Sequence, residues 1–323
     1  MKLLTVGLDV GGTKVLGVVT DSTGAVLGEQ RRPTPMGSGS ELVEALAEMT
    51  AELCRVPGLE RSDSSVGAVG VGVAGLVDRA GVVHYAPNLP QVRRLDLATS
   101  LAAEASLPVV VDNDANAAAW GEVVFGAARG LRHVIVVTLG TGIGGGLVVD
   151  GALCRGAHGF AAEIGHITVV RGGPLCACGD EGHWEAIAAG PALGRLGRDR
   201  AQEGRAAEVL RRAGGDPESI TGRHISEAAL AGDAEACALL DEYADAVSLG
   251  LAALANVLDP ERIIIGGGIV EMGELLMDRV RSAFLLHLEG ASERPDVPIV
   301  AATLGEHAGS IGAAALAREL LPA

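Results

Sequence analysis

Residues 3–20 read LLTVGLDVGGTKVLGVVT, and residues 133–150 read HVIVVTLGTGIGGGLVVD. In both stretches, two apolar, β-branched segments flank a turn rich in glycine and threonine, which is typical of a β-hairpin. The two copies are offset by about 130 residues, and we interpret them as a structural duplication of a βββαβα unit, one per domain. A chance similarity in a chain rich in Gly and Val is the alternative.

The rest of the chain alternates between strand and helix patterns. The first hairpin continues into a third antiparallel strand, and Ser40 is expected to N-cap the helix that follows. Residues 155–190 are irregular and Gly-rich, whereas residues 191–258 have a helical pattern. This alternation indicates an α/β fold. The other expected strands are 25–33, 66–73, 109–111, 133–139, 146–150, 263–269 and 297–303, and the other expected helices are 40–55, 96–106, 115–126, 270–288 and 308–320.

The length of 323 residues indicates two domains. We expect a small α/β domain at residues 1–112, completed by a C-terminal helix at about 305–323. Residues 113–304 form the expected large α/β domain, with a zinc-binding loop and helices of the dimerisation type. The apolar content of 48% fits a sizeable core, which Val, Leu, Ile and Ala must build because aromatic residues make up only 2%.

Charge and composition exclude several kinds of partner. The net charge of −16 argues against nucleic acid, because binding to its phosphates needs basic patches. The sequence holds no run of about 18 apolar residues, so no membrane span is predicted. It also lacks the pattern of a signal peptide, and we expect a cytoplasmic protein. The cysteines form an odd set, which indicates reduced thiols and a metal site rather than a disulfide framework: Cys54, Cys154, Cys176, Cys178 and Cys237.

Three glycine-rich turns each follow an apolar strand: DVGGTK at 9–14, GTGIGGG at 140–146 and GGG at 266–268. Glycine lets backbone N–H groups converge on an anion, so we interpret the three turns as phosphate-binding loops, with ordinary turns as the alternative. Residues 7–14 are not a P-loop, because Lys and Thr stand in the wrong order and a strand follows. Residues 140–145 match G-x-G-x-x-G, but no helix follows to bind a pyrophosphate.

A carboxylate-rich segment, VVVDNDANAAAWGE, runs from a strand into a helix at residues 109–122. Asp114 lies near the junction, where a carboxylate can accept the proton of a hydroxyl nucleophile. Asp112, Asn113 and Asp114 fit a helix N-cap cluster equally well. Spacing alone leaves both interpretations open.

Four residues follow the pattern H-x9-C-x-C-x4-H: His166, Cys176, Cys178 and His183. Thiolates and imidazoles are the usual ligands of tetrahedral structural zinc, so we predict a zinc site. The alternative is that His183 points elsewhere and zinc binding is weak or lost.

The segment DNDANAAAWGE (112–122) closely resembles the E/D-N-D-A-N-A-A-A-x-x-E signature of the ROK family of repressors, open reading frames and kinases. VGVGVAGLVD (69–78) is similar to the glycine turn of that family, AAEIGHITV (161–169) carries its E-x-G-H motif, and HWEAIAAG (183–190) is similar to its C-W-E-x-x-A-S-G stretch. The resemblance extends from residue 4 to about residue 316. One departure is CACGDEGH, where His183 stands in place of the third cysteine of the family pattern C-x-C-G-x-x-G-C.

The resemblance implies a two-domain actin/hexokinase-like (ribonuclease H-like) ATPase fold and assigns roles to the motifs. It makes Asp114 the catalytic base, and it directs Asp9 toward a magnesium–phosphate complex through water. The implied sugar-binding residues are Gly75, Asn113, Asp114, Glu163, His166 and Glu185. The implied nucleotide-binding residues are Asp9, Gly11, Gly12, Thr13, Lys14, Gly140, Thr141, Gly142, Gly266, Gly267 and Gly268. The implied cofactors are ATP, Mg²⁺ and structural Zn²⁺.

The resemblance also implies the activity: an ATP-dependent hexose kinase, with phosphorylation of the 6-hydroxyl of glucose as the expected reaction. Kinases for N-acetylmannosamine, N-acetylglucosamine, fructose or allose and a non-catalytic sugar sensor are alternatives, and polyphosphate is an alternative donor. Repressors of the family carry a winged helix-turn-helix before the kinase-like part, whereas this chain begins directly with the first strand. The expected partners are a sugar and further copies of the chain, in a homodimer or homotetramer.

Overall fold

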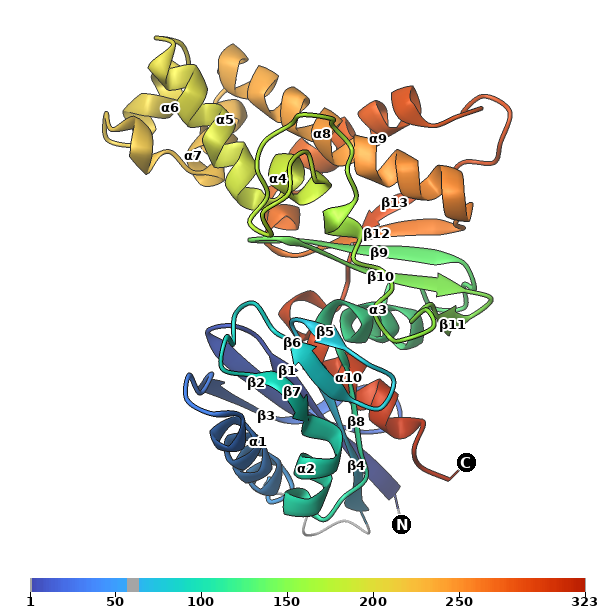
Figure 1. Ribbon diagram of the computed structural model, residues 1–323. Coiled ribbons are helices and arrows are strands. Elements are labelled where there is room, and N and C mark those ends of the chain that lie inside the picture. Colours follow the sequence, from blue (N-terminus) through green and yellow to red (C-terminus); the bar gives the residue numbers. More distant parts are fainter. Residues whose placement is uncertain (1, 57–63, 323) are drawn as a thin grey trace. The chain divides into compact units, whose positions relative to one another are not determined.

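The computed structural model describes residues 2–56 and 64–322, and the chain divides into two compact units (Figure 1). The first unit comprises Met1–Val136, Gly146–Ala162 and Ala302–Ala323. The second unit comprises Val137–Gly145 and Glu163–Ala301. The division predicted from the sequence, 1–112 with the C-terminal helix against 113–304, stays a prediction.

Two five-stranded sheets share one topology. The first has the order β3-β2-β1-β4-β8, and the second has the order β11-β10-β9-β12-β13. In each sheet, three strands that are consecutive in the chain lie next to one another, and helices connect them to the last two strands. Those last two strands, β4 and β8 in the first sheet and β12 and β13 in the second, pair in parallel. The strands are β1 (Lys2–Val10), β2 (Lys14–Thr20), β3 (Val26–Pro33), β4 (Ser64–Val73), β8 (Val109–Asn113), β9 (Val134–Leu139), β10 (Ile143–Val149), β11 (Ala152–Leu153), β12 (Arg262–Gly266) and β13 (Ile299–Ala301). This repeat confirms the duplicated α/β unit.

Ten α-helices lie within the described residues. They are α1 (Gly39–Leu53), α2 (Leu97–Ala105), α3 (Asp114–Val124), α4 (Trp184–Ala188), α5 (Gly190–Gln202), α6 (Ala207–Arg212), α7 (Gly222–Leu230), α8 (Ala234–Leu258), α9 (Glu274–His287) and α10 (Ala308–Arg318). The predicted N-cap of the first helix was wrong by two residues, because the side chain of Ser38, not Ser40, accepts the hydrogen bond from the Glu41 N–H. In the described residues, none of the helices has both the length and the apolar character needed to cross a membrane.

Alternation along the strands gives the first sheet two different faces. The valines of β4 at 69, 71 and 73 pack into a core with side chains of β1, α1 and α2. The glycines between them lie on the opposite face, which α3 and α10 cover. A methyl group on Gly70 would overlap with the carbonyl oxygen of Ala313, and one on Gly7 would overlap with that of Ser310. The Gly–Val pattern therefore lets two helices approach the sheet backbone closely.

The helices α3 and α10 lie side by side in the first unit and approach each other as closely as they approach the sheet (Figure 1). A methyl group on Gly312 would overlap with the carbonyl oxygen of Ala117. Small residues thus fix where α3 begins, and with it the position of Asp114.

A three-stranded antiparallel sheet, which no sequence pattern had indicated, also lies in the first unit. It consists of β5 (Leu76–Val77), β6 (Val82–Tyr85) and β7 (Arg93–Asp96). The strand predicted at 263–269 ends earlier, at Gly266, because Gly267 takes a positive φ of 87° and the 3₁₀ helix η3 (Gly268–Met272) follows.

The second unit is mainly helical, and the 25-residue helix α8 packs against α4, α5, α7 and α9. Two buried aromatic side chains tie α4 to α8. The indole N–H of Trp184 donates to the carbonyl of Ala246 (3.1 Å), and the hydroxyl of Tyr243 donates to that of Ala188 (2.7 Å). These bonds satisfy the polar ends of both rings inside the core.

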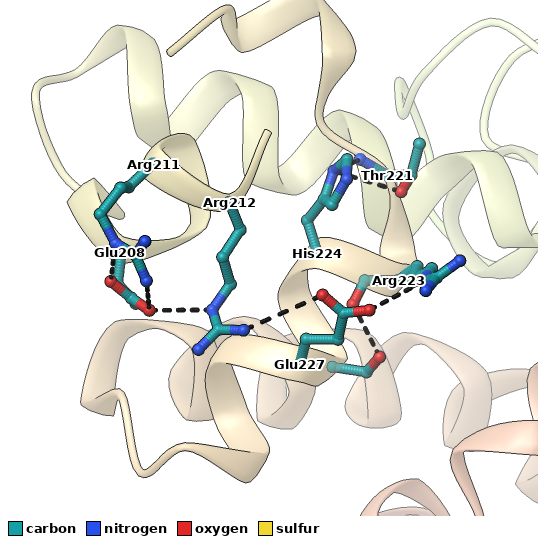
Figure 2. Close-up of polar contacts among 8 residues, drawn as sticks. Glu208, Arg211, Arg212, Thr221, Arg223, His224 and Glu227 are labelled. Carbon is teal, nitrogen blue, oxygen red and sulfur yellow. Dashed lines mark hydrogen bonds and ion pairs between the residues drawn. The ribbon is translucent and has the colours of Figure 1, made fainter. Parts of the chain in front are cut away.

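Helices α6 and α7 carry a surface network that we call the α6–α7 charge cluster (Figure 2). Glu208 pairs with Arg211 (2.6 Å) and Arg212 (2.8 Å). Arg212 reaches Glu227 at 3.9 Å, and Glu227 pairs with Arg223 at 2.7 Å. The arginine side chains at 211 and 223 are 68% and 83% exposed, so water screens these pairs.

Candidate active site

The junction between β8 and α3 decides between the two interpretations of the DND segment. Asn113 is the N-cap of α3, and its Oδ1 accepts hydrogen bonds from the N–H groups of Ala115 (2.8 Å) and Asn116 (3.1 Å). Its amide donates to the carbonyl of Gly75 at 3.1 Å, which links the cap to the predicted sugar-binding glycine turn. Asp114 is the first helical residue and is half-buried. The cap is therefore Asn113, and Asp114 is available for another role.

Two carboxylates share this corner of the first unit. Asp9 lies at the end of β1 opposite Gly72 of β4, and a methyl group on Gly72 would lie 3.3 Å from the Cα of Asp114. Burial raises the pKa of Asp114. Burial and, to a smaller extent, the charge of Asp114 raise the pKa of Asp9 to about 7, partly offset by Lys14. A carboxylate with a raised pKa is a better proton acceptor, which fits a general base.

The first glycine turn joins β1 to β2. The N–H of Gly11 donates to the carbonyl of Lys14 (3.0 Å), and the hydroxyl of Thr34 donates to the carbonyl of Gly11 (2.7 Å). Gly12 is half-buried, whereas Thr13 and Lys14 are exposed. The ammonium group of Lys14 lies 3.5 Å from Glu306, so the cation at the end of this turn is paired with an acidic side chain.

The second and third glycine turns lie together in the second unit. Gly140 bonds across its own turn to the carbonyl of Gly142 (3.0 Å) and accepts from the N–H of Gly190 (2.8 Å). Thr141 is exposed. A methyl group on Gly267 would overlap with the carbonyl oxygen of Leu139, so the turn at Gly266–Gly268 packs against the strand that leads into Gly140. A parallel sheet brings such turns to one edge.

Glu185 contacts both the second turn and the cysteine-rich loop. Its Oε2 accepts from the N–H of Ile143 (2.9 Å), directly after Gly142, and its Oε1 accepts from the thiol of Cys176 (3.6 Å). Glu163 is exposed and comes directly before the 3₁₀ helix η1 (Ile164–His166). The structure thus adds a loop contact that the sequence pattern did not predict for Glu185.

The four predicted metal ligands lie together. The ligand atoms of His166, Cys176, Cys178 and His183 are all within 4.8 Å of one another. The thiol of Cys178 is 3.2 Å from Nδ1 of His183, and that of Cys176 is 3.8 Å from Nδ1 of His166. Burial raises the pKa of the Cys176 thiol to about 11, and a bound divalent cation favours the thiolate instead. Two thiols and two imidazoles in this arrangement fit tetrahedral zinc, His183 included.

One charged residue near the junction has no signal in the sequence. Arg155, in the Gly-rich stretch after β11, forms an ion pair with Asp112 at 2.6 Å. The two residues are 43 positions apart, and neither belongs to a spacing pattern that joins them.

The two sheets of corresponding strand order and the solved structures to which the chain is similar show the two-domain fold of the actin/hexokinase-like ATPase class. The family comparison is more specific. The ROK family matches residues 5–320, and the chain belongs to this family.

Similarity to individual proteins extends along almost the whole chain. The chain is 44% identical over 319 residues to the glucokinase of Streptomyces coelicolor, and the match covers 98% of each sequence. The crystal structure of a ROK family glucokinase from Streptomyces griseus in complex with glucose and AMPPNP is 43% identical, with a TM-score of 0.82 over 98% of this chain and 99% of that one. The ROK hexokinase of Thermus thermophilus is 35% identical, with a TM-score of 0.78 over 98% and 99% of the two chains.

Proposed function

We propose that this chain is an ATP-dependent hexose kinase that phosphorylates the 6-hydroxyl of glucose. The observation that carries the proposal is the 43% identity, over 98% of the chain, to an enzyme whose structure contains glucose and AMPPNP. The glucokinase of Streptomyces coelicolor supports the same activity at 44% identity. The half-buried Asp114 at the start of α3 supplies a suitable base.

In the proposed reaction, Asp114 accepts the proton of the sugar hydroxyl as that oxygen attacks the γ-phosphorus of ATP. The bond from the γ-phosphorus to the bridging oxygen breaks, and ADP leaves. Asn113, Gly75, Glu163, His166 and Glu185 bind and orient the sugar, so that positioning supplies much of the rate.

Each unit supplies part of the proposed nucleotide-binding residues. Gly11–Lys14 of the first unit and Gly140–Gly142 of the second bind phosphates through backbone N–H groups, and Gly266–Gly268 lie by the nucleoside. Asp9 would hold a magnesium–phosphate complex through water, since magnesium often retains waters. The metal ion, when bound, would supply positive charge that offsets the charge of the phosphates.

Asp114→Asn tests the catalytic role. The variant is expected to fold and bind glucose but to lose at least about 100-fold in kcat, because it cannot accept the proton. A coupled ADP-release assay with glucose measures this loss, and glucose titration checks binding. Asp150→Asn is the matched control, since the Asp150 side chain is 77% exposed, and it should keep the unaltered rate. Near-normal turnover of Asp114→Asn would discredit the assignment.

We further propose that His166, Cys176, Cys178 and His183 bind a structural zinc ion that fixes the loop carrying His166 and Glu185. The clustered donor atoms support this role. Metal analysis of the purified protein should find about one zinc per chain. A content below about 0.2 per chain, with activity unaffected by chelators, would remove zinc from the mechanism.

The choice of hexose and donor is tested by one panel. ADP release with glucose, fructose, allose, N-acetylmannosamine and N-acetylglucosamine should be fastest with glucose, and polyphosphate replaces ATP in a parallel series. ADP release with none of these sugars would favour a non-catalytic sugar sensor. We expect a homodimer or homotetramer, which light scattering measures directly.

A further inference from the structure

Asp112 is a buried carboxylate that the proposed mechanism does not use. Its side chain is 6% exposed and lies near the end of β8, two residues before Asp114. Its Oδ1 accepts from the backbone N–H of Asn113 (2.8 Å) and from the side-chain amide of Asn116 (2.9 Å). The carboxylate therefore binds the last residue of the strand and the first turn of α3 at the same time.

Arg155 completes the contacts of this carboxylate. Its Nε donates to Oδ2 of Asp112 at 2.6 Å, and its side chain is 29% exposed. A second carboxylate, Glu319, also interacts with the charge of Arg155. Burial raises the pKa of Glu319, and the charge of Arg155 offsets part of that rise. Arg155 is thus the cation that offsets the charge of a buried aspartate at the base of the candidate active site.

Loss of one member of such a pair has a specific consequence. A buried carboxylate without its partner is strongly unfavourable, so the surroundings rearrange or admit water. Here the groups free to move are the Asn113 N–H and the first turn of α3, which hold Asp114. A displacement of about 1 Å in a reacting group can lower a rate about 100-fold.

We propose that Arg155 is a positioning residue: through its ion pair with Asp112 it holds the β8–α3 junction in the geometry in which Asp114 acts as the base. The proposal rests on the proposed kinase function. It assigns a role in turnover to a residue that is not among the proposed sugar-binding or nucleotide-binding residues.

A second arginine that contacts the same turn provides a matched control. Arg79 also binds the turn after β11, through two hydrogen bonds from its guanidinium to the carbonyl of Gly156 (3.0 and 2.6 Å). Its contact with the turn does not involve the carboxylate of Asp112. Arg79→Met therefore loosens the same turn without unpairing that carboxylate.

The test compares kcat and KM of Arg155→Met, Arg155→Lys and Arg79→Met with those of the unaltered chain. Arg155→Met is expected to lower kcat about 10- to 100-fold. KM for ATP should stay within about twofold, because the nucleotide turns are unchanged. Arg155→Lys should recover part of the rate, since a lysine restores the charge but not the N–H geometry. Arg79→Met should keep kcat within about twofold.

A double variant separates positioning from general loss of stability. Asp112→Asn keeps the oxygen that accepts from Asn113 and Asn116 but removes the charge. The combined variant Arg155→Met with Asp112→Asn should be at least as active as Arg155→Met alone, because no unpaired buried charge remains. Losses that multiply in the double variant would overturn the positioning role.

The remaining outcomes also test the positioning role of Arg155. An Arg155→Met enzyme with unaltered kcat and only a lower melting temperature would make the pair purely structural. Equal losses in Arg79→Met and Arg155→Met would assign the effect to the turn rather than to Asp112. If the unaltered chain phosphorylates no sugar, the proposed function itself fails and the positioning role falls with it. If the unaltered chain is active and Arg155→Met is equally active, only the positioning role fails.

Discussion

Contacts between arginines and carboxylates occur in two contrasting settings. In the first unit, Asp112 and Arg155 have side chains that are 6% and 29% exposed, and Asp112 also holds two groups of the β8–α3 junction. In the second unit, the α6–α7 charge cluster has more ion pairs, but its carboxylates are more exposed than Asp112, with Glu208 at 27% and Glu227 at 38% (Figure 2). Exposed pairs contribute little because water competes with both partners. Burial, not the number of pairs, therefore indicates which charges the fold depends on.

Glu122 is a carboxylate of the first unit that is even more buried than Asp112. It is fully buried at the C-terminal part of α3. Its Oε1 accepts from the N–H groups of Thr303 (2.9 Å) and Leu304 (2.8 Å), and its Oε2 accepts from the N–H of Ala127 (2.7 Å) and the hydroxyl of Thr303 (3.1 Å). The carboxylate thereby fastens the segment before α10 to α3.

The largest loss of stability is expected from Glu122→Gln. The new NH₂ group would face N–H donors and leave at least one of them unpaired, which lowers the free energy of unfolding by about 1–3 kcal/mol. Urea denaturation measures the change, and Glu208→Gln in the exposed cluster is the control. If Glu122→Gln has the same unfolding midpoint as the unaltered chain, a buried carboxylate is no more important for stability than a carboxylate at the surface.

An effect of opposite sign is expected from Asp9→Asn at high pH. The folded-state pKa of about 7 lies above the ordinary value of 3.8, so the folded chain binds this proton more tightly than the unfolded chain. The resulting stabilisation is fully present below pH 3.8 and is lost as the pH rises through 7. At pH 8 the variant, which carries no charge there, should melt several degrees higher than the unaltered chain.

Melting curves at pH 5 and pH 8 test this sign. The difference between Asp9→Asn and the unaltered chain should grow with pH, whereas Asp150→Asn should give no such trend. A variant that is less stable than the unaltered chain at pH 8 would mean that the Asp9 carboxylate is stabilised rather than strained.

The smallest effect is expected within the α6–α7 charge cluster. Glu208→Gln and Glu227→Gln each remove surface pairs that water can reach, and the melting temperature should change by less than about 1 °C. Measurement at low and high salt checks that screening explains the result. A clear loss in the double variant beyond the sum of the single ones would show that the cluster acts as a cooperative network.

Much of the fold could be predicted because short sequence patterns indicate its strands, turns and helices. The two hairpins with their glycine turns indicated the duplicated α/β unit, and the DNDANAAAWGE segment carried the resemblance to the ROK family; the strand orders and the family match confirm both. The roles assigned to the site residues stay predictions. Within each unit, however, the structure brings several of them together, as with Asn113 and Gly75 or with Gly267 and the strand before Gly140.

What the sequence could not reveal depends on contacts between distant residues. Arg155 reaches Asp112 across 43 positions, and Glu122 reaches Thr303 across 181. No local spacing encodes such pairs. The small sheet β5-β6-β7 was missed because its strands have only two to four residues, too few for a clear alternation. The glycines at 7, 70 and 312 looked like ordinary small residues, although each permits a close backbone approach.

The place of α10 has a consequence for how the protein is made. This helix covers β1 and β4 and packs against α3, yet it leaves the ribosome about 300 residues after β1. Until then, α3 alone covers part of this face of the first sheet, whereas Glu163–Ala301 of the second unit have already been translated. Nascent chains stalled before residue 308 should therefore expose the part of the glycine-lined face that α10 covers, so that chaperones can bind there until this helix has been synthesised.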